Sequence, residues 1–344
     1  MAAKRGESRE FIHFYRLRER SEVENRRALL CSFSFGHGII TFISGAVARA
    51  NRATARSTER KDKMEASCKK QLSIAAARIR MDVVEGTFHA KSGHPGGSLS
   101  IADTLAYLYF KEMKVDPANP KWEARDRFVL SKGHAAPALY GALAQKGYFP
   151  EEEIQSLRHV GARLQGHPDM KGIPGVDMST GSLGQGVSCA AGMALAAKLD
   201  KADWRVYTIL GDGEIEEGQV WEAAMFAAHK KLDNLCVVVD NNNLQIDGCL
   251  DEVNSPYPIP EKFAAFGFNV IVIDAHDWDQ MEAAFDAARA CKGKPTAIIQ
   301  RSVKGKGVSF MENQVGWHGT APNQEQYETA MAELKAALHE LEVG

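Results

Sequence analysis

Two short polar segments each follow an apolar run that is typical of a buried β-strand. Asp212 stands in a Gly-Asp-Gly turn directly after residues 206–210, and Asn242 stands in an Asn-Asn-Asn run directly after residues 235–240. A Gly-Asp-Gly turn by itself is common and indicates nothing. The carboxyl ends of parallel strands, however, meet at one edge of a sheet, where ligands bind. The two segments together therefore predict a ligand site at that edge.

The oxygen atoms of these segments suit a magnesium ion. Mg²⁺ takes near-octahedral oxygen coordination, usually from one or two protein groups together with phosphate oxygens. The Asp212 carboxylate, the Asn242 amide oxygen and the main-chain carbonyl of Leu244 could bind one face of the ion. Two diphosphate oxygens and a water would complete the shell. The glycines on either side of Asp212 would let the main chain approach a diphosphate closely.

Four histidines stand in turns bounded by glycine or proline: His94, His134, His167 and His318. A single loop histidine is more often a surface residue, but four in such contexts are hard to attribute to packing. The imidazole pKa lies near neutrality, so these side chains suit binding and proton transfer on polyhydroxy substrates. We interpret them as candidate catalytic residues.

The elements that must position these residues alternate between strand and helix patterns. Strand-like apolar runs lie at residues 127–130, 206–210, 235–240, 269–274 and 296–303. Helix-like segments lie at residues 67–90, 99–113, 186–199, 218–231, 278–291 and 324–342. This alternation predicts an α/β fold with a mostly parallel sheet and helices on both faces. We expect one domain over residues 67–344, ending in the last of these helices.

Composition excludes several classes of protein. The chain has 344 residues, 44% of them hydrophobic, and a net charge of -2, so we expect no nucleic-acid or membrane partner.

Residues 1–66 are more basic than the rest of the chain, because residues 1–63 contain 14 Lys and Arg but only 7 Asp and Glu. The apolar stretch within them is too interrupted for a membrane span. They are interpreted as an over-extended start before Met64, a targeting segment or a disordered appendage.

The six cysteines are scattered, without a CxxC pair or zinc-ligand spacing. This pattern is typical of free thiols in a reducing compartment, so we expect a cytoplasmic protein. Cys189 and Cys236 lie within apolar runs and are expected in the core.

From Lys69 to Pro322 the chain resembles the N-terminal, thiamine-diphosphate-binding region of transketolase. The resemblance rests on SGHPGGSLS, DRFVLSKGHAAPALY, GHPD, STGSLGQG, GDGEIEEGQVWEA and DNNNLQIDG. It implies a thiamine-diphosphate-binding fold, Mg²⁺ held by Asp212, Asn242 and Leu244, and a reacting sugar surrounded by the four histidines. The implied cofactor-binding residues are Gly181, Ser182, Leu183, Gly184, Gly211, Asp212, Gly213, Glu214, Asn242 and Lys304.

The resemblance also implies a partner. The family continues into a pyrimidine-binding domain, whose glutamate contacts the cofactor, and we find no candidate for that glutamate within 67–344. We therefore expect a transketolase subunit of the pentose phosphate pathway that acts on sugar phosphates only with a C-terminal subunit, as an α2β2 heterotetramer. Glu217 and Glu222 match family positions at the subunit contact.

One segment departs from single-chain transketolases. Residues 303–308, Val-Lys-Gly-Lys-Gly-Val, look more like split transketolases or deoxyxylulose-phosphate synthase. This departure leaves the donor and acceptor sugars open. The alternatives are a subunit of another thiamine-diphosphate enzyme, of the synthase or keto-acid-decarboxylating type, and a non-catalytic cofactor-binding module.

Overall fold

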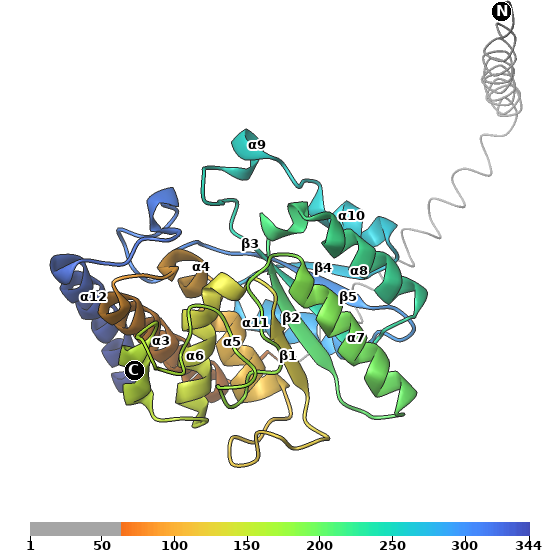
Figure 1. Ribbon diagram of the computed structural model, residues 1–344, viewed down its shortest axis with the longest axis horizontal. Helices are drawn as coiled ribbons and strands as arrows, with labels where there is room; N and C mark the ends of the chain where they lie inside the picture. The colour runs from red at the N-terminus through yellow and green to blue at the C-terminus, as the bar shows by residue number, and fades with distance from the viewer. Residues whose placement is uncertain (1–62) are drawn as a thin grey trace, which may run out of the picture. The chain divides into compact units, whose positions relative to one another are not determined.

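The computed structural model describes residues 63–344, so the expectations for residues 1–62 lie outside the described part of the chain. Residues Met64–Gly344 form one compact unit around a five-stranded sheet (Figure 1). The strands are β1 (Arg127–Leu130), β2 (Val206–Gly211), β3 (Leu235–Asn241), β4 (Asn269–Asp274) and β5 (Thr296–Arg301). Their order is β1-β2-β3-β5-β4, and each neighbouring pair is parallel. The predicted parallel α/β sheet is confirmed.

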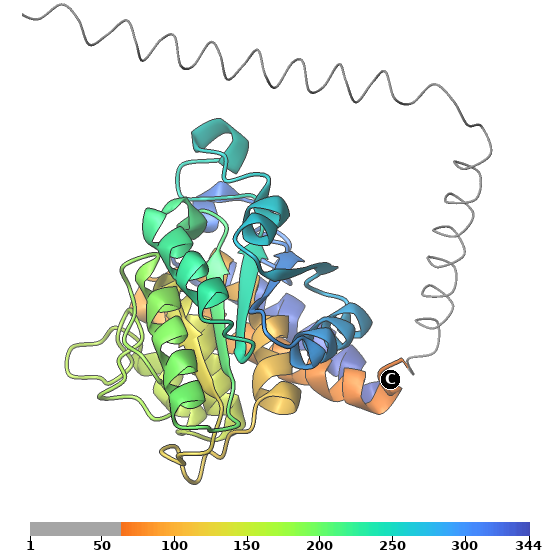
Figure 2. The ribbon, with the colours of Figure 1, turned by 90° about the vertical axis from the view of Figure 1, so that its right-hand side faces the viewer.

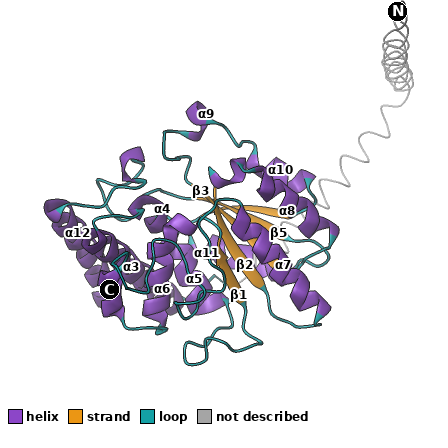
Figure 3. Ribbon diagram, in the orientation of Figure 1, coloured by secondary structure: helices purple, strands orange, loops and turns teal. Residues whose placement is uncertain are grey.

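Helices surround this sheet (Figure 3). The longer ones are α3 (Ala66–Ala90), α6 (Ala136–Lys146), α7 (Gln185–Leu199), α8 (Gly218–His229), α11 (Trp278–Ala290) and α12 (Gln324–Val343). The shorter ones are α4 (Pro95–Leu99), α5 (Ala102–Tyr107), α9 (Leu250–Val253) and α10 (Ile259–Ala265). The sequence patterns predicted all of the longer helices except α6.

Two predicted boundaries were wrong. The segment 99–113 is not one helix but the end of α4, then α5, then a π-helical turn at Leu108–Glu112. The break falls at Ser100, whose hydroxyl bonds to the Asp240 carboxylate instead of facing solvent. Strand β5 ends at Arg301, and directly after it, at the carboxyl edge of the sheet, the Ser302 hydroxyl bonds to the same carboxylate.

The alternating side chains of the strands divide the core into two layers. Phe128 and Val238 face the cluster that contains α3, α5, α6, α11 and α12, whereas Val129 and Val237 face the cluster that contains α7, α8 and α10. Figure 2 shows α7 and α8, in green, on the side of the sheet opposite α3 and α12. Both faces are thus covered, as predicted, and the ligand-capable groups are confined to the strand ends.

The five cysteines within the described residues are free thiols. Cys236 is buried as predicted, but Cys189 is only half-buried, because its position on α7 does not face the sheet. Between residues 63 and 344, no helix combines the length and the apolar character needed to cross a membrane.

Candidate active site

A cavity of about 300 Å³ opens at the carboxyl ends of β2 and β3. It brings together residues from both strand ends, from the turns before α4 and α6, and from the segment after β5. Its lining consists of His94, Gly97, Lys132, His134, Gly181, Leu183, Gly211, Asp212, Gly213, Glu214, Asn242, Leu244, Gln245, Ile246, Lys304 and His318. All of these except Gly97, Lys132, Gln245 and Ile246 are among the predicted site residues.

Asp212 follows the last residue of β2 and is 2% exposed. Its carboxylate accepts hydrogen bonds only from neutral donors: the Gly213 and Asn243 main-chain amides, at 2.9 and 2.6 Å, and the Asn241 side chain at 3.1 Å. Burial and the neighbouring Asp240 carboxylate raise the pKa of Asp212 to about 6. Within residues 63–344 no cation pairs with this carboxylate, so it is a buried acid that a bound cation would stabilise.

Asn242 and Leu244 supply the other predicted metal ligands. The Asn242 side chain donates through Nδ2 to Asp240 and accepts through Oδ1 from the Leu244 amide, at 3.0 and 3.2 Å. The Leu244 carbonyl accepts from Nζ of Lys304 at 3.1 Å. Within the described residues, no group of three or more His, Cys, Asp or Glu side chains is arranged so that these side chains alone could hold a metal ion. The predicted site has one carboxylate and two neutral oxygens, a set suited to Mg²⁺ only if phosphate oxygens complete it.

Three of the four predicted histidines form one cluster over this cavity. The ring centroids of His94 and His134 are 5.3 Å apart, those of His134 and His318 are 5.3 Å apart, and those of His94 and His318 are 5.6 Å apart. Burial, followed by nearby cations, lowers the pKa of His94 to about 4 and of His318 to about 3, and lowers that of His134 well below its usual value. All three rings are therefore neutral at pH 7.

Lys304 joins the cluster to the strand ends. Its Nζ lies 2.9 Å from Nδ1 of His318 and donates to the Leu244 carbonyl. Burial, with the nearby Lys132 ammonium, lowers the pKa of Lys304 to about 8. Gly305 has a positive φ of 77°, and a Cβ there would lie 2.3 Å from a carbonyl oxygen, so this turn requires glycine.

The Glu214 side chain forms hydrogen bonds that connect three segments of the fold. It is 2% exposed, and its two carboxylate oxygens accept from the Ser131 hydroxyl at 2.5 Å and from the main-chain amides of Gly184 and Gly211 at 2.9 Å each. These bonds tie the ends of β1 and β2 to the beginning of α7. The carboxylate is engaged by the chain itself, so any contact with a cofactor stays a prediction.

Three predicted residues lie outside the cavity lining: His167, Ser182 and Gly184. His167 packs against Gly181, where an added Cβ would lie 3.3 Å from the imidazole ring, and burial lowers its pKa. Gly184 adopts the left-handed conformation that starts α7, and Ser182 is exposed. Glu217, the residue before α8, and Glu222, within α8, are not in the lining either. Their roles stay predictions.

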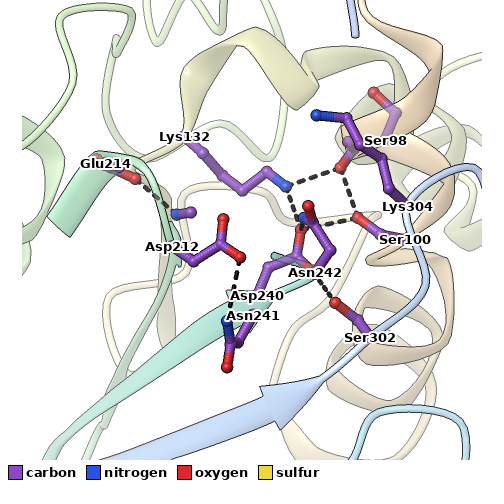
Figure 4. Close-up of polar contacts among 12 residues, drawn as sticks. Ser98, Ser100, Lys132, Asp212, Glu214, Asp240, Asn241, Asn242, Ser302 and Lys304 are labelled. Atoms are coloured by element: carbon purple, nitrogen blue, oxygen red, sulfur yellow. Dashed lines mark hydrogen bonds and ion pairs between the residues drawn. The ribbon is translucent and has the colours of Figure 1, made fainter. Parts of the chain in front are cut away.

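Sequence reasoning missed a buried ion pair at the cavity, in which Lys132 belongs to the lining and Asp240 does not. Lys132 and Asp240 are 2% and 1% exposed and bond through Nζ and Oδ2 (Figure 4). Burial opposes the charge of Asp240, but the Lys132 ammonium together with the hydrogen bonds from Lys132, Ser302 and Ser100 lowers the pKa of Asp240. The available signal was Lys132 itself, a charged residue two positions after the end of an apolar strand.

The site fits a diphosphate with a divalent cation on three observations. Asp212 is a buried carboxylate without a cation partner in the described chain, and two neutral oxygens lie along the same edge. Nδ1 of His94 is buried and has no hydrogen-bond partner within residues 63–344, which leaves it open to a ligand. Gly97 and Gly211 line the cavity without side chains, and so leave room beside the ion pair.

Comparisons with known proteins agree with this geometry. Residues 69–339 match the family described as transketolase, thiamine diphosphate binding domain. The chain is 51% identical over 243 residues to a 6-deoxy-6-sulfo-D-fructose transketolase subunit of Clostridium sp. (strain MSTE9), covering 71% of this chain and 88% of that protein. It is 42% identical over 271 residues to one of the apulose-4-phosphate transketolase subunits of Phocaeicola vulgatus, covering 79% and 96%.

Solved structures give the same family. Transketolase from Campylobacter jejuni superposes with a TM-score of 0.72 at 30% identity, covering 81% of this chain and 46% of that one. The chain thus spans less than half of the solved transketolase but most of the two transketolase subunits. Its family match covers the strand ends, the histidine cluster and the buried ion pair. The chain belongs to the transketolase family of enzymes, as a thiamine-diphosphate-binding domain.

Proposed function

We propose that this chain is the N-terminal subunit of a transketolase, which transfers a two-carbon ketol unit from a ketose phosphate to an aldose phosphate. The observation that carries the proposal is the cluster of His94, His134 and His318 above the oxygen-lined edge formed by Asp212 and Asn242. Both groups of residues line one cavity of about 300 Å³, where a hydroxylated substrate and a metal diphosphate would lie next to each other. Thiamine diphosphate, when bound, would supply the group that stabilises a carbanion at the reacting carbon.

We further propose Mg²⁺ as the metal. Asp212, Asn242 and the Leu244 carbonyl would hold one face of the ion, and diphosphate oxygens would complete its shell. Lys304 donates to the Leu244 carbonyl in this structure, so its ammonium is placed to pair with the negative charge that the diphosphate brings.

The histidines would bind and orient the sugar. Because burial keeps His94 and His318 neutral at pH 7, each ring has one donor and one acceptor nitrogen for hydroxyl or carbonyl oxygens. A neutral ring can also accept a proton from a hydroxyl that is becoming a carbonyl, and later return it. His167, beside Gly181, would extend this surface away from the metal edge.

The partner in this proposal is a C-terminal subunit that carries the pyrimidine-binding domain. Support comes from the two relatives that the chain matches over most of their length, because both are named transketolase subunits. Two apolar side chains of the cavity, Leu183 and Ile246, are 37% and 62% exposed, which a covering subunit would bury. We propose an α2β2 assembly with two-fold symmetry, a cytoplasmic location and a place in the pentose phosphate pathway.

The test is reconstitution. The full chain should give no measurable turnover of ketose phosphate alone, because a cofactor held at one end is not positioned for reaction. Adding a C-terminal transketolase subunit from the same organism should restore glycolaldehyde transfer, followed by a coupled assay for the aldose phosphate released. Light scattering should show the two chains in one complex.

Two outcomes would overturn parts of this proposal. Robust turnover by the chain alone would contradict the need for a partner. Consumption of pyruvate by the reconstituted pair, without glycolaldehyde transfer, would identify a synthase or decarboxylating enzyme instead. A His94→Ala chain, mixed with the same partner, is the control that ties any activity to this cavity.

A further inference from the structure

Asp240 is a heavily hydrogen-bonded side chain beside the site. It is 1% exposed, and its Oδ2 accepts from Nζ of Lys132, from the Ser100 hydroxyl at 2.7 Å and from Nδ2 of Asn242 at 3.0 Å. Its Oδ1 accepts from the Ser302 hydroxyl. These donors come from four segments: the turn after β1, the turn between α4 and α5, the end of β3 and the end of β5 (Figure 4). The carboxylate is therefore fixed in position and in charge.

The ionised Asp240 carboxylate restricts the Asn242 amide. A carboxylate of this kind can only accept hydrogen bonds, so it can face only the NH₂ end of the amide. The C=O end must then point the other way. In the structure Oδ1 does so: it accepts a hydrogen bond from the Leu244 amide, on the side of the cavity. Without an acceptor oxygen at position 240, the NH₂ end of the amide would lose its partner, and among the described residues only the Leu244 N–H would favour this orientation.

We propose that Asp240, paired with Lys132, is a positioning residue that locks the Asn242 side chain with its oxygen toward the bound cation. The proposal rests on the metal diphosphate site of the proposed function. Lys132 holds Asp240 in its ionised form and place, Ser100 and Ser302 fix its rotation, and Asp240 fixes the amide. Groups that orient a metal ligand in this way typically change metal affinity by about 10–100-fold when removed.

A purely structural ion pair would look similar in the fold, so the test must separate the two roles. Removing one partner of a buried pair destabilises a protein strongly, whereas removing both costs far less. We therefore compare two double variants that lack the ion pair and carry equal charge, Lys132→Met with Asp240→Asn and Lys132→Met with Asp240→Ala. They differ in whether residue 240 still offers an acceptor oxygen to Asn242.

The readout is metal affinity of the full chain, without catalysis. Mn²⁺ is titrated at a fixed concentration of thiamine diphosphate, and water-proton relaxation reports the Mn²⁺ that is held on the slowly tumbling protein. We expect the variant with Asp240→Ala to bind Mn²⁺ about tenfold more weakly than the variant with Asp240→Asn. Equal Mn²⁺ affinities in the two variants would overturn the proposal.

A double-mutant cycle adds a second criterion. Asn242→Ala should weaken Mn²⁺ binding strongly in the Asp240→Asn background and little in the Asp240→Ala background, because a misoriented amide is already lost as a ligand. Equal losses in both backgrounds would overturn the positioning role. Failure of the unmodified chain to bind Mn²⁺ with thiamine diphosphate is a different result, which would overturn the metal site itself.

A milder variant covers the case in which a double variant does not fold. Ser302→Ala removes one donor to Asp240 and should weaken Mn²⁺ binding a few-fold while the melting temperature changes little. Ser309→Ala, which removes an exposed hydroxyl bonded to Glu333, is the matched control and should change neither quantity. A Ser302→Ala chain with unchanged Mn²⁺ affinity would contradict the proposal.

Discussion

The ends of β2 and β3 lie side by side, and each carries a buried aspartate, but the two carboxylates have opposite charge environments. Asp240, the sixth residue of β3, pairs with Lys132, and its pKa is lowered. Asp212, just after β2, accepts only from neutral donors, and its pKa is raised to about 6. The two aspartates are 1% and 2% exposed, so burial alone does not explain the difference.

The difference is that the chain pairs the charge of Asp240 with a lysine and, within its described part, leaves the charge of Asp212 without a cation partner. An ionised group that is nearly fully buried is costly unless it is paired. The chain supplies that pair for Asp240 and supplies none for Asp212 within residues 63–344. The unpaired carboxylate lines the cavity, whereas the paired one is not among the lining residues.

Breaking the Lys132–Asp240 ion pair should cause the largest loss of stability. Lys132→Met leaves Asp240 buried without its cation, and we expect the free energy of unfolding to fall by about 3–5 kcal/mol. Urea unfolding followed by circular dichroism measures this loss. Lys306→Met, in an exposed pair with Glu312, is the control and should change stability little. A loss of similar size in both variants would mean that the Asp240 pair is no different from a surface pair.

Asp212→Ala should reduce cofactor affinity more than it reduces stability. Removing a carboxylate that lacks a cation partner among the described residues should lower the free energy of unfolding less than Lys132→Met does, because only hydrogen bonds from neutral donors are lost. Mg²⁺-dependent binding of thiamine diphosphate should fall by ~100-fold or more, because the site loses its only carboxylate ligand. Asn242→Ala should be milder. Calorimetric titration of the cofactor with and without Mg²⁺ decides this, and unchanged affinity in Asp212→Ala would remove the metal assignment.

The histidine cluster should make the stability of the protein depend on pH. Burial lowers the pKa of His94 to about 4, below the value of about 6.5 for an unfolded chain. Between these values the unfolded state binds the additional proton, so stability should fall as the pH is lowered from 6.5 to 4. His94→Gln should make that decline shallower by up to about one proton, measured by urea unfolding across this range. An identical decline would show that the ring is not buried as described.

Removing residues 1–63 should change the protein least. This basic segment carries no site residue, and Met64, whose side chain is buried and whose amide bonds to Asp279, is kept. We expect the melting temperature and the Mg²⁺-dependent cofactor affinity to stay unchanged. A large fall in melting temperature would mean that this segment packs on the domain, and that the environments of the two aspartates depend on it.

Sequence patterns predicted much of the fold because they are local. Each strand is a short apolar run, and five of these runs became the five strands of the parallel sheet. The sequence also indicated that Asp212 and Asn242 lie at the carboxyl edge of the sheet, because both residues follow closely after their strands. By contrast, α6 was missed, since its residues are apolar nearly all round and show no helical alternation.

Local patterns were sufficient to place Asp212, Asn242 and three of the four histidines around one cavity at the carboxyl edge of a parallel α/β sheet. They did not reveal that β5 lies between β3 and β4, that His167 stands outside the cavity, or that Lys132 pairs with Asp240 across 108 positions of the chain. The physical reason is that strand order and buried charge pairing depend on contacts between distant segments. No spacing within one segment records which carboxylate pairs with the lysine and which one lacks a cation partner in the described part of the chain.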